Sequence, residues 1–177
     1  MSELPPGWTR RVLRDVIVEG PSNGYSPKSD HDAAGTPTLK LSATTSGRFV
    51  LNQSTTKRIH ETIAPQSKFW LLPGDVVIQR ANTLEYVGTT AIFDGPPNTY
   101  IYPDLMMRVR VGPTVDPKYL SSFLNAPATR AAVREKATGT AGNMPKINGE
   151  TVRSIQIDLP PLPEQRRIVA KLEALQA

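Results

Sequence analysis

The chain has 177 residues, of which 38% are hydrophobic and 21% charged, so it is the size of one domain that can bury a core. It contains no cysteine, which excludes disulfides, thiol catalysis and thiolate metal sites. It has neither an apolar run of about 18 residues nor a signal-peptide pattern at its N-terminus, so we expect a cytoplasmic protein that does not enter a membrane. The net charge of +5 makes a polyanion such as nucleic acid a candidate partner.

The first 111 residues predict short extended segments separated by turns, because many of the 17 prolines interrupt this part of the chain. Six extended segments are expected, at residues 9–13, 38–43, 49–51, 76–78, 87–93 and 105–111. Gly, Pro, Ser, Asn and Asp are concentrated in residues 20–35, which predicts a loop. Residues 61–69 predict one or two helical turns, interrupted near Pro65.

Helices are predicted after residue 115. Asp116 and Pro117 combine a helix cap with a proline at the first helical position. Apolar residues then recur at helical spacing, and a second helix is expected over residues 128–137. A loop at 138–143 follows, and alternating polarity predicts a strand at 155–159.

The C-terminal segment differs from the rest. Residues 160–163 contain three prolines and predict an extended spacer. From residue 164 to 177 there is no proline or glycine, and Ile168, Leu172 and Leu175 are spaced as at the start of a coiled-coil seam. The helix has no C-terminal cap, so we expect either a longer helix that has been cut or a naturally half-sized subunit. The fold class is therefore α+β: a mainly β region with long loops plus short helices, followed by the start of a long coiled-coil-type helix.

Patterns for catalysis and metal binding are weak. His31 and His60 lie far apart, and Asp30-His31-Asp32 is interpreted as a solvated loop, because a metal site needs a full ligand set. One nuclease pattern stays open as an alternative: Asp104, Asp116 and Lys118 match a spaced Pro-Asp … Asp-x-Lys signature. Asp116 is better explained as a helix cap, since Pro117 would interrupt the strand that this signature requires. We expect no catalytic residue, metal or cofactor.

Several segments occur in an order typical of one family. Residues 4–8 read LPPGW and are followed by VLRD at 12–15, residues 72–80 read LPGDVVIQR, and residues 138–147 and 155–159 form a closing loop and strand. The most specific run is LPPLPEQRRIV at 159–169. Together these segments resemble the specificity subunits of type I restriction–modification systems, and the final run is similar to the junction where a recognition domain passes into the family's long helix.

The resemblance implies a division of labour. A complete subunit of that family carries two recognition domains separated by paired antiparallel helices, and each domain reads one half of a split DNA target. Methyltransferase subunits, which bind S-adenosylmethionine and modify adenine, dock on it, and motor–nuclease subunits supply ATP-driven translocation and cleavage. By resemblance, residues 1–160 are one target-recognition domain and residues 161–177 begin the conserved helix. The chain would read double-stranded DNA and carry no enzyme activity itself.

Three segments are candidates for DNA contact, because basic side chains neutralise phosphates and side chains with paired donors and acceptors discriminate bases. The first spans residues 79–86, directly after the buried strand at 76–78, and offers Arg80, Asn82, Thr83 and Tyr86. The second spans residues 40–58. It includes Lys40, Thr44, Arg48, Lys57 and Arg58. The third is the loop at 138–146, with Asn143 and Lys146.

The terminal helix has a separate expected role. Ile168, Leu172 and Leu175 are predicted to pair with a helix of a second recognition domain or of a second copy. The alternative is that this helix only packs on its own domain. A further alternative is an interaction protein in which the helix is the functional element and the β region is a scaffold.

Overall fold

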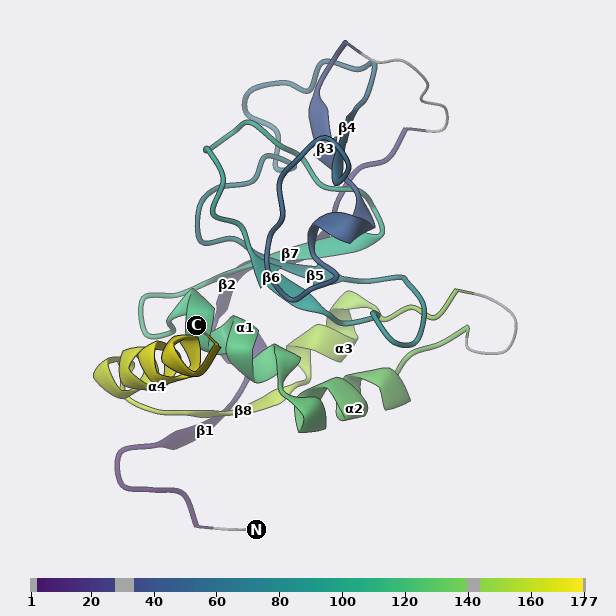
Figure 1. Cartoon of the computed structure of the whole chain (residues 1–177). Helices are drawn as coiled ribbons and strands as arrows, with labels where there is room; N and C mark the ends of the chain where they lie inside the picture. Colours follow the sequence, from purple (N-terminus) through teal and green to yellow (C-terminus); the bar gives the residue numbers. More distant parts are fainter. Residues whose placement is uncertain (1–2, 28–33, 140–143, 177) are drawn as a thin grey trace.

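The centre of the molecule is a four-stranded antiparallel sheet with the order β2–β7–β5–β6 (Figure 1). The computed structural model describes residues 3–27, 34–139 and 144–176. The strands of the sheet are β2 (Ile17–Asn23), β7 (Met106–Val111), β5 (Val76–Gln79) and β6 (Thr90–Ile92). Strands β5 and β7 lie in the middle of the sheet.

Two smaller sheets flank the centre. Strand β1 (Thr9–Val12) pairs with β8 (Gln156–Leu159), which brings the N-terminal strand beside the segment that leads into the last helix. Strand β3 (Pro37–Leu39) pairs with β4 (Thr56–Arg58). Figure 1 shows the β3–β4 pair on the opposite side of the central sheet from the helices.

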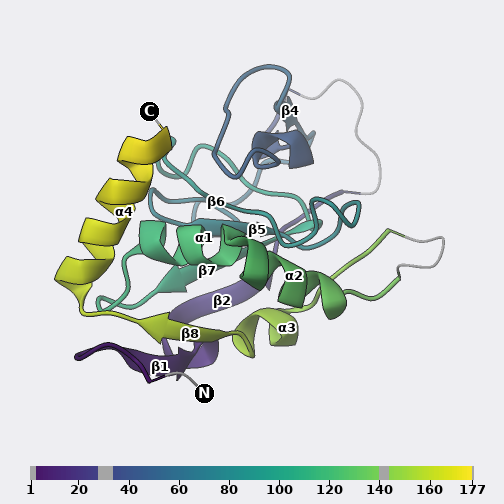
Figure 2. The ribbon, with the colours of Figure 1, turned by 60° about the horizontal axis from the view of Figure 1, so that its bottom comes forward.

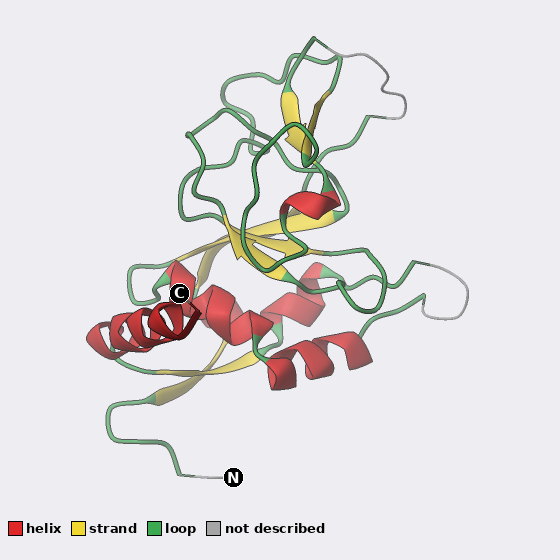
Figure 3. Cartoon of the chain, in the orientation of Figure 1, coloured by secondary structure: helices red, strands yellow, loops and turns green. Residues whose placement is uncertain are grey.

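The α-helices gather on one side of the central sheet, and loops dominate the other side (Figure 3). They are α1 (Pro117–Asn125), α2 (Pro127–Glu135), α3 (Gly149–Arg153) and α4 (Leu162–Gln176), and short 3-10 turns cover Leu13–Asp15 and Leu41–Ala43. Figure 2 shows α1 lying across the sheet, α2 continuing from it, and α4 to one side. No helix in the described ranges is both long and apolar enough to span a bilayer.

The two middle strands, β5 and β7, bury side chains on both faces of the central sheet. Successive residues of a strand point to opposite sides, so each strand contributes to two cores. Val76 and Ile78 belong to the core beneath the helices, whereas Val77 belongs to a second core beneath the loops. Strand β7 follows the same alternation, with Met107 in the first core and Met106 in the second. The sheet is therefore a middle layer between two cores, and the loops pack on one side of it.

Charged groups are buried at one place in this layer. Arg108 of β7 is 1% exposed and pairs with Glu19 of β2, while its Nη1 lies 3.8 Å from a carboxylate oxygen of Asp75. Arg110 donates to Asp75 over 2.5 Å and to Glu19 over 2.6 Å. Two carboxylates thus offset two guanidinium charges, which is the condition for burying such groups.

A buried glutamine near the start of the C-terminal helix holds that end of the helix on the domain. Gln165 has no exposed surface, and its Oε1 accepts from the backbone N–H of Asp116 over 2.8 Å. Its Nε2 donates to the carbonyls of Thr114 and Pro160 over 2.9 and 2.8 Å. The amide is satisfied on both sides, so the start of α4 is anchored to the segment that enters α1.

The predicted fold class is confirmed: a mainly β part with long loops is combined with short helices and a C-terminal helix. Strand β5 and helix α1 are where the patterns predicted them, and the Asp116 side chain caps α1 by accepting from the N–H of Lys118. The loop prediction for residues 20–35 is wrong for 20–23, which lie in β2. There the strand tolerates Gly20 and Pro21 at an irregularity in its register with β7.

Other local predictions are also corrected. Residues 61–69 form turns and no helix, residues 49–51 form no strand, and β4 and α3 were not predicted. The predicted strand 38–43 is shorter, since residues 41–43 form a 3-10 turn. Helix α4 begins at Leu162, so Pro163 lies in its first turn and not in an extended spacer. A proline is tolerated there because the first N–H groups of a helix have no partner within it.

Candidate nucleic-acid interface

Strand β5 ends at Gln79 and passes directly into a closed loop at residues 80–88. The N–H groups of Tyr86 and Val87 both donate to the carbonyl of Thr83, and the N–H of Gly88 donates back to the carbonyl of Gln79 over 2.7 Å. Gly88 has φ +81°, and a Cβ there would lie 2.7 Å from Cγ1 of Val133. The loop is therefore held at both ends and pressed against helix α2.

The first and third candidate segments lie side by side. Ala81 forms an antiparallel bridge with Lys146, the N–H of Asn82 donates to Pro145 over 3.2 Å, and the N–H of Ile147 donates to Arg80 over 2.9 Å. Figure 1 shows the loop that follows β5 next to the connection between α2 and α3. We call the surface formed by residues 80–86 and 144–146 the paired-loop surface. Its backbone is fixed by β5 on one side and by this pairing on the other.

Gln79 connects this surface to the second candidate segment. Its side chain has no exposed surface; Nε2 donates to Thr44 Oγ1 over 2.9 Å and to the carbonyl of Leu41 over 3.1 Å. Its Oε1 accepts from the side-chain amide of Asn82 over 2.5 Å. The sequence placed Gln79 at the start of the first candidate segment but assigned it no role, because its partners Leu41 and Thr44 are distant in the chain.

Two arginines of helix α2 hold the loop at residues 80–88 by hydrogen bonds to its backbone. Buried Arg130 donates to the carbonyls of Val87 and Glu85 over 2.5 and 2.7 Å, and Arg134 also donates to the carbonyl of Glu85 over 2.7 Å. Burial, and then the nearby charge of Arg134, lower the pKa of Arg130 to about 10. Both arginines were assigned no role from the sequence, because their partners are backbone atoms more than 40 residues away in the chain.

The predicted residues on the paired-loop surface differ in what they can contact. Arg80 is half-buried and donates to the carbonyl of Asp104 over 3.4 Å; since a guanidinium has five N–H donors, others remain for a ligand. Thr83 and Lys146 are exposed, and Tyr86 is half-buried. Asn82 points inward, because its amide donates to Gln79 and its oxygen accepts from the N–H of Thr83 over 2.7 Å. Asn143 lies outside the described residues.

The second candidate segment is corrected at one position. Thr44 was expected on an exposed loop, but it is fully buried, where it accepts from Gln79 and donates to the carbonyl of Leu41. Lys40 and Arg58 are exposed and donate to the carbonyls of Ser54 and Gly35. The other predicted residues of this segment, Arg48 and Lys57, are exposed.

The nuclease pattern has other roles in the fold. Asp116 caps α1, and Lys118 forms an ion pair with Glu173 of α4 over 2.8 Å. In the part of the chain that the structure describes, no three His, Asp or Glu residues are grouped as a metal site requires. The triplet Asp30-His31-Asp32 lies outside the described residues.

The predicted helix-pairing residues do not share one environment. Ile168 packs against the main core of its own domain, beside the buried Val169, so it is occupied within this chain. Leu172 and Leu175 are 37% and 77% exposed. Of the three predicted residues, the two in the second half of α4 are therefore the ones with exposed apolar side chains.

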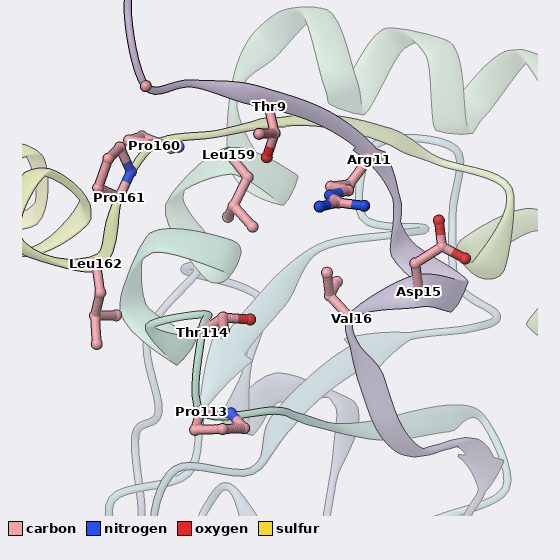
Figure 4. Close-up of a pocket in the computed structure, with 11 residues that line it drawn as sticks. Thr9, Arg11, Asp15, Val16, Pro113, Thr114, Leu159, Pro160, Pro161 and Leu162 are labelled. Carbon is pink, nitrogen blue, oxygen red and sulfur yellow. The ribbon is translucent and has the colours of Figure 1, made fainter.

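A groove lies where β8 passes into α4 (Figure 4). Arg11 and Asp15 line one part of it, and Pro160 and Pro161 line another. The polar side chains of its lining are those of Thr9, Arg11, Asp15 and Thr114.

Comparison with known proteins gives a consistent result. A family model described as the type I restriction modification DNA specificity domain matches residues 5–177. The specificity subunit of the type I restriction enzyme EcoKI from Escherichia coli (strain K12) is 29% identical over 94% of this chain and 36% of that protein. A putative type I restriction enzyme MjaX specificity subunit from Methanocaldococcus jannaschii is 26% identical over 95% of this chain and 39% of that protein.

Solved structures agree at the level of the fold. The HsdS subunit from Thermoanaerobacter tengcongensis has a TM-score of 0.71 and 25% identity, covering 98% of this chain and 43% of that chain. The S subunit of a type I restriction–modification system from M. genitalium has a TM-score of 0.64 and 14% identity, covering 99% of this chain and 41% of that chain. This chain thus spans about two fifths of the length of these relatives.

Proposed function

The chain belongs to the family of type I restriction–modification DNA specificity domains, and on that premise we propose that it reads one half of a bipartite double-stranded DNA target. The relatives it matches are named as specificity subunits of restriction enzymes, and it spans 36% and 39% of the length of two of them. We propose that residues 1–160 form one recognition domain and that residues 161–177 begin the helix after it. A single recognition domain agrees with a chain that spans less than half the length of those relatives. We propose that DNA methylation and cleavage are carried out by other subunits of the complex.

The observation that carries the proposal is the backbone pairing of residues 80–82 with residues 145–147. It joins two segments that each contain candidate DNA-contacting side chains. The segment 80–82 continues from β5, which is buried on both faces, and the pairing ties residues 145–147 to it. The side chains of both segments are therefore held in a fixed geometry, which base recognition requires.

The side chains on this surface suit two kinds of DNA contact. Arg80 is proposed to donate to a guanine edge in the major groove, with Thr83 and Tyr86 beside it. Exposed Lys146 is proposed to neutralise a phosphate. Lys40, Arg48, Lys57 and Arg58 are proposed to make further phosphate contacts along the duplex. Asn82 is assigned to holding the loop rather than to reading a base, since its amide is engaged with Gln79.

Assembly is the second part of the proposal. Methyltransferase subunits and motor–nuclease subunits are the proposed protein partners, and a DNA-bound complex of this kind would act in the cytoplasm. Leu172 and Leu175, exposed on α4, are proposed to pack against a helix of a second recognition domain or of a second copy. Anchoring of α4 by Gln165 supports this role, because it fixes the direction in which the helix leaves the domain.

A selection from random duplex DNA tests the proposal. The purified chain is incubated with the library at low and moderate salt, and the bound fraction is sequenced. We expect enrichment of one short motif and weaker binding at higher salt, since phosphate contacts release counterions. Absence of an enriched motif at both salt concentrations, also with methyltransferase subunits added, would contradict the proposal.

A further inference from the structure

The paired-loop surface carries two exposed apolar side chains that none of its proposed polar contacts uses. Leu84 is 47% exposed and Met144 is 51% exposed. Both residues lie among polar and basic neighbours, Thr83 and Lys146, which are exposed as well. Two exposed apolar side chains on one proposed binding surface are candidates for contact with an apolar feature of the partner.

The backbone brings Leu84 and Met144 to the same end of the paired segments. Met144 directly precedes Pro145, whose carbonyl accepts from the N–H of Asn82. Antiparallel pairing therefore directs Met144 toward the turn that begins at Thr83. In that turn the N–H groups of Tyr86 and Val87 donate to the carbonyl of Thr83. Leu84 therefore lies inside the turn, between its hydrogen-bonded residues.

The major groove of DNA offers one apolar feature on its base edges, the C5-methyl group of thymine. Leucine and methionine side chains can pack against this methyl group while Arg80 and Lys146 contact the polar edge and the phosphates of the same duplex. The basic side chains of Arg80 and Lys146 favour DNA as the partner of this surface, because phosphates supply the opposite charge. Against an apolar protein surface, both side chains would lose hydration without gaining a counter-charge.

We propose that Leu84 and Met144 contribute to specificity by packing against thymine C5-methyl groups in the major groove. This inference rests on the proposed function and deepens it: it names an apolar contact within the same surface. It requires at least one thymine in the half-site that the chain selects.

Deoxyuridine substitution tests the inference, because uracil differs from thymine only by the missing methyl group. Each thymine of the selected duplex is replaced in turn, and binding is measured with the full chain and with Leu84→Ala and Met144→Ala. For the unmodified chain we expect an affinity loss of about fourfold at one or more positions, the factor for burying one methyl-sized group. At such a position, one of the two variants should bind the thymine and uracil duplexes equally.

Val18→Ala is the matched control. Val18 is 68% exposed on β2, near the end of β7 that pairs with Ile17, whereas Gln79 pairs with the other end of β7. This variant should keep the thymine-to-uracil ratio of the unmodified chain. Thermal unfolding midpoints for all three variants establish that each is folded.

Three results would overturn the inference: no thymine in the selected half-site, no loss at any deoxyuridine position, or a loss that persists undiminished in both Leu84→Ala and Met144→Ala. In each of these cases motif enrichment would still stand, so the proposed function would survive. Failure of the proposed function has a different signature, since no motif would then be enriched.

Discussion

The side-chain amide of Gln79 donates to Thr44 Oγ1 over 2.9 Å at a place where neither residue has any exposed surface. The two residues are 35 positions apart in the sequence. The same side chain accepts from Asn82, so one buried amide ties the loop after β5 to the segment after β3. Buried polar groups of this kind fix one arrangement of the loops around them, because leaving them unpaired is costly.

Gln79→Met tests this link. Methionine has a similar volume but cannot replace the hydrogen bonds to Leu41, Thr44 and Asn82, so we expect the free energy of unfolding to fall by about 1–3 kcal/mol. Discrimination between the selected duplex and a scrambled duplex should fall as well. Urea unfolding and equilibrium binding measure the two effects. Gln156→Met, at an exposed position of β8, is the control, and an equal loss in both variants would contradict a specific role for Gln79.

Arg130→Met tests the support that α2 gives to the loop. The carbonyl of Val87 then loses its arginine donor, while the carbonyl of Glu85 keeps its bond from Arg134. We expect a loss of about 2 kcal/mol in unfolding free energy, because the removed hydrogen bonds are charge-assisted. Hydrogen exchange of the amides at residues 83–88 should become faster. Arg134→Met, which removes one donor from Glu85 only, should have a smaller effect, and the reverse order would contradict this assignment.

Lys146→Met tests the proposed phosphate contact. We expect affinity to fall by a similar factor for the selected and scrambled duplexes, because a phosphate contact carries no sequence information. The slope of log affinity against log salt should decrease by about one. Lys171→Met, at an exposed position of α4, removes the same charge elsewhere and should leave the slope unchanged. An unchanged slope for Lys146→Met would place Lys146 outside the DNA contact.

Glu19→Gln tests, through the pH dependence of stability, the ion-pair cluster in which the partly exposed Glu19 faces Arg108 and Arg110. Burial by itself would raise the pKa of Glu19, but hydrogen bonds and charges from Arg110 and Arg108 outweigh it and hold the pKa below the ordinary value of 4.5. A carboxyl whose pKa is lower in the folded state stabilises that state above pH 4.5, and this contribution is lost as pH falls through the folded pKa.

The variant should therefore be less stable than the original chain at neutral pH, and the difference should shrink on acidification below pH 4.5. Unfolding free energies in urea, measured across the acid range, give the comparison. Glu135→Gln, at the exposed C-terminal end of α2, is the control for loss of one negative charge. A stability difference that does not change with pH would contradict the role of the Glu19 carboxylate.

Elements set by local patterns could be predicted from the sequence. The β-branched run at Val76 gave the buried strand β5, and Asp116 followed by Pro117 marked the start of α1. Elements that depend on distant partners could not be predicted in the same way. Gly20 and Pro21 favour a loop locally, yet they lie in β2 because β7 pairs with that segment.

The candidate site shows the same division. The segments around Arg80 and Lys146 were both selected from the sequence, but the bridge between them, from Ala81 to Lys146, joins residues 65 positions apart and has no local signal. Thr44 was expected on an exposed loop, in a segment where basic residues cluster. It is buried and accepts a hydrogen bond from Gln79, which lies in a distant strand. Which polar residues of a loop face inward is decided by such tertiary contacts.

The most direct test of sequence reading at the paired-loop surface is a base-by-base affinity profile of the selected duplex, measured for the unmodified chain and for Arg80→Met. If Arg80 donates to a guanine edge, the variant should lose discrimination of about tenfold or more at a single G·C pair and keep the rest of the profile. A profile that is unchanged, or lowered equally at every position, would contradict base reading by Arg80 at this surface.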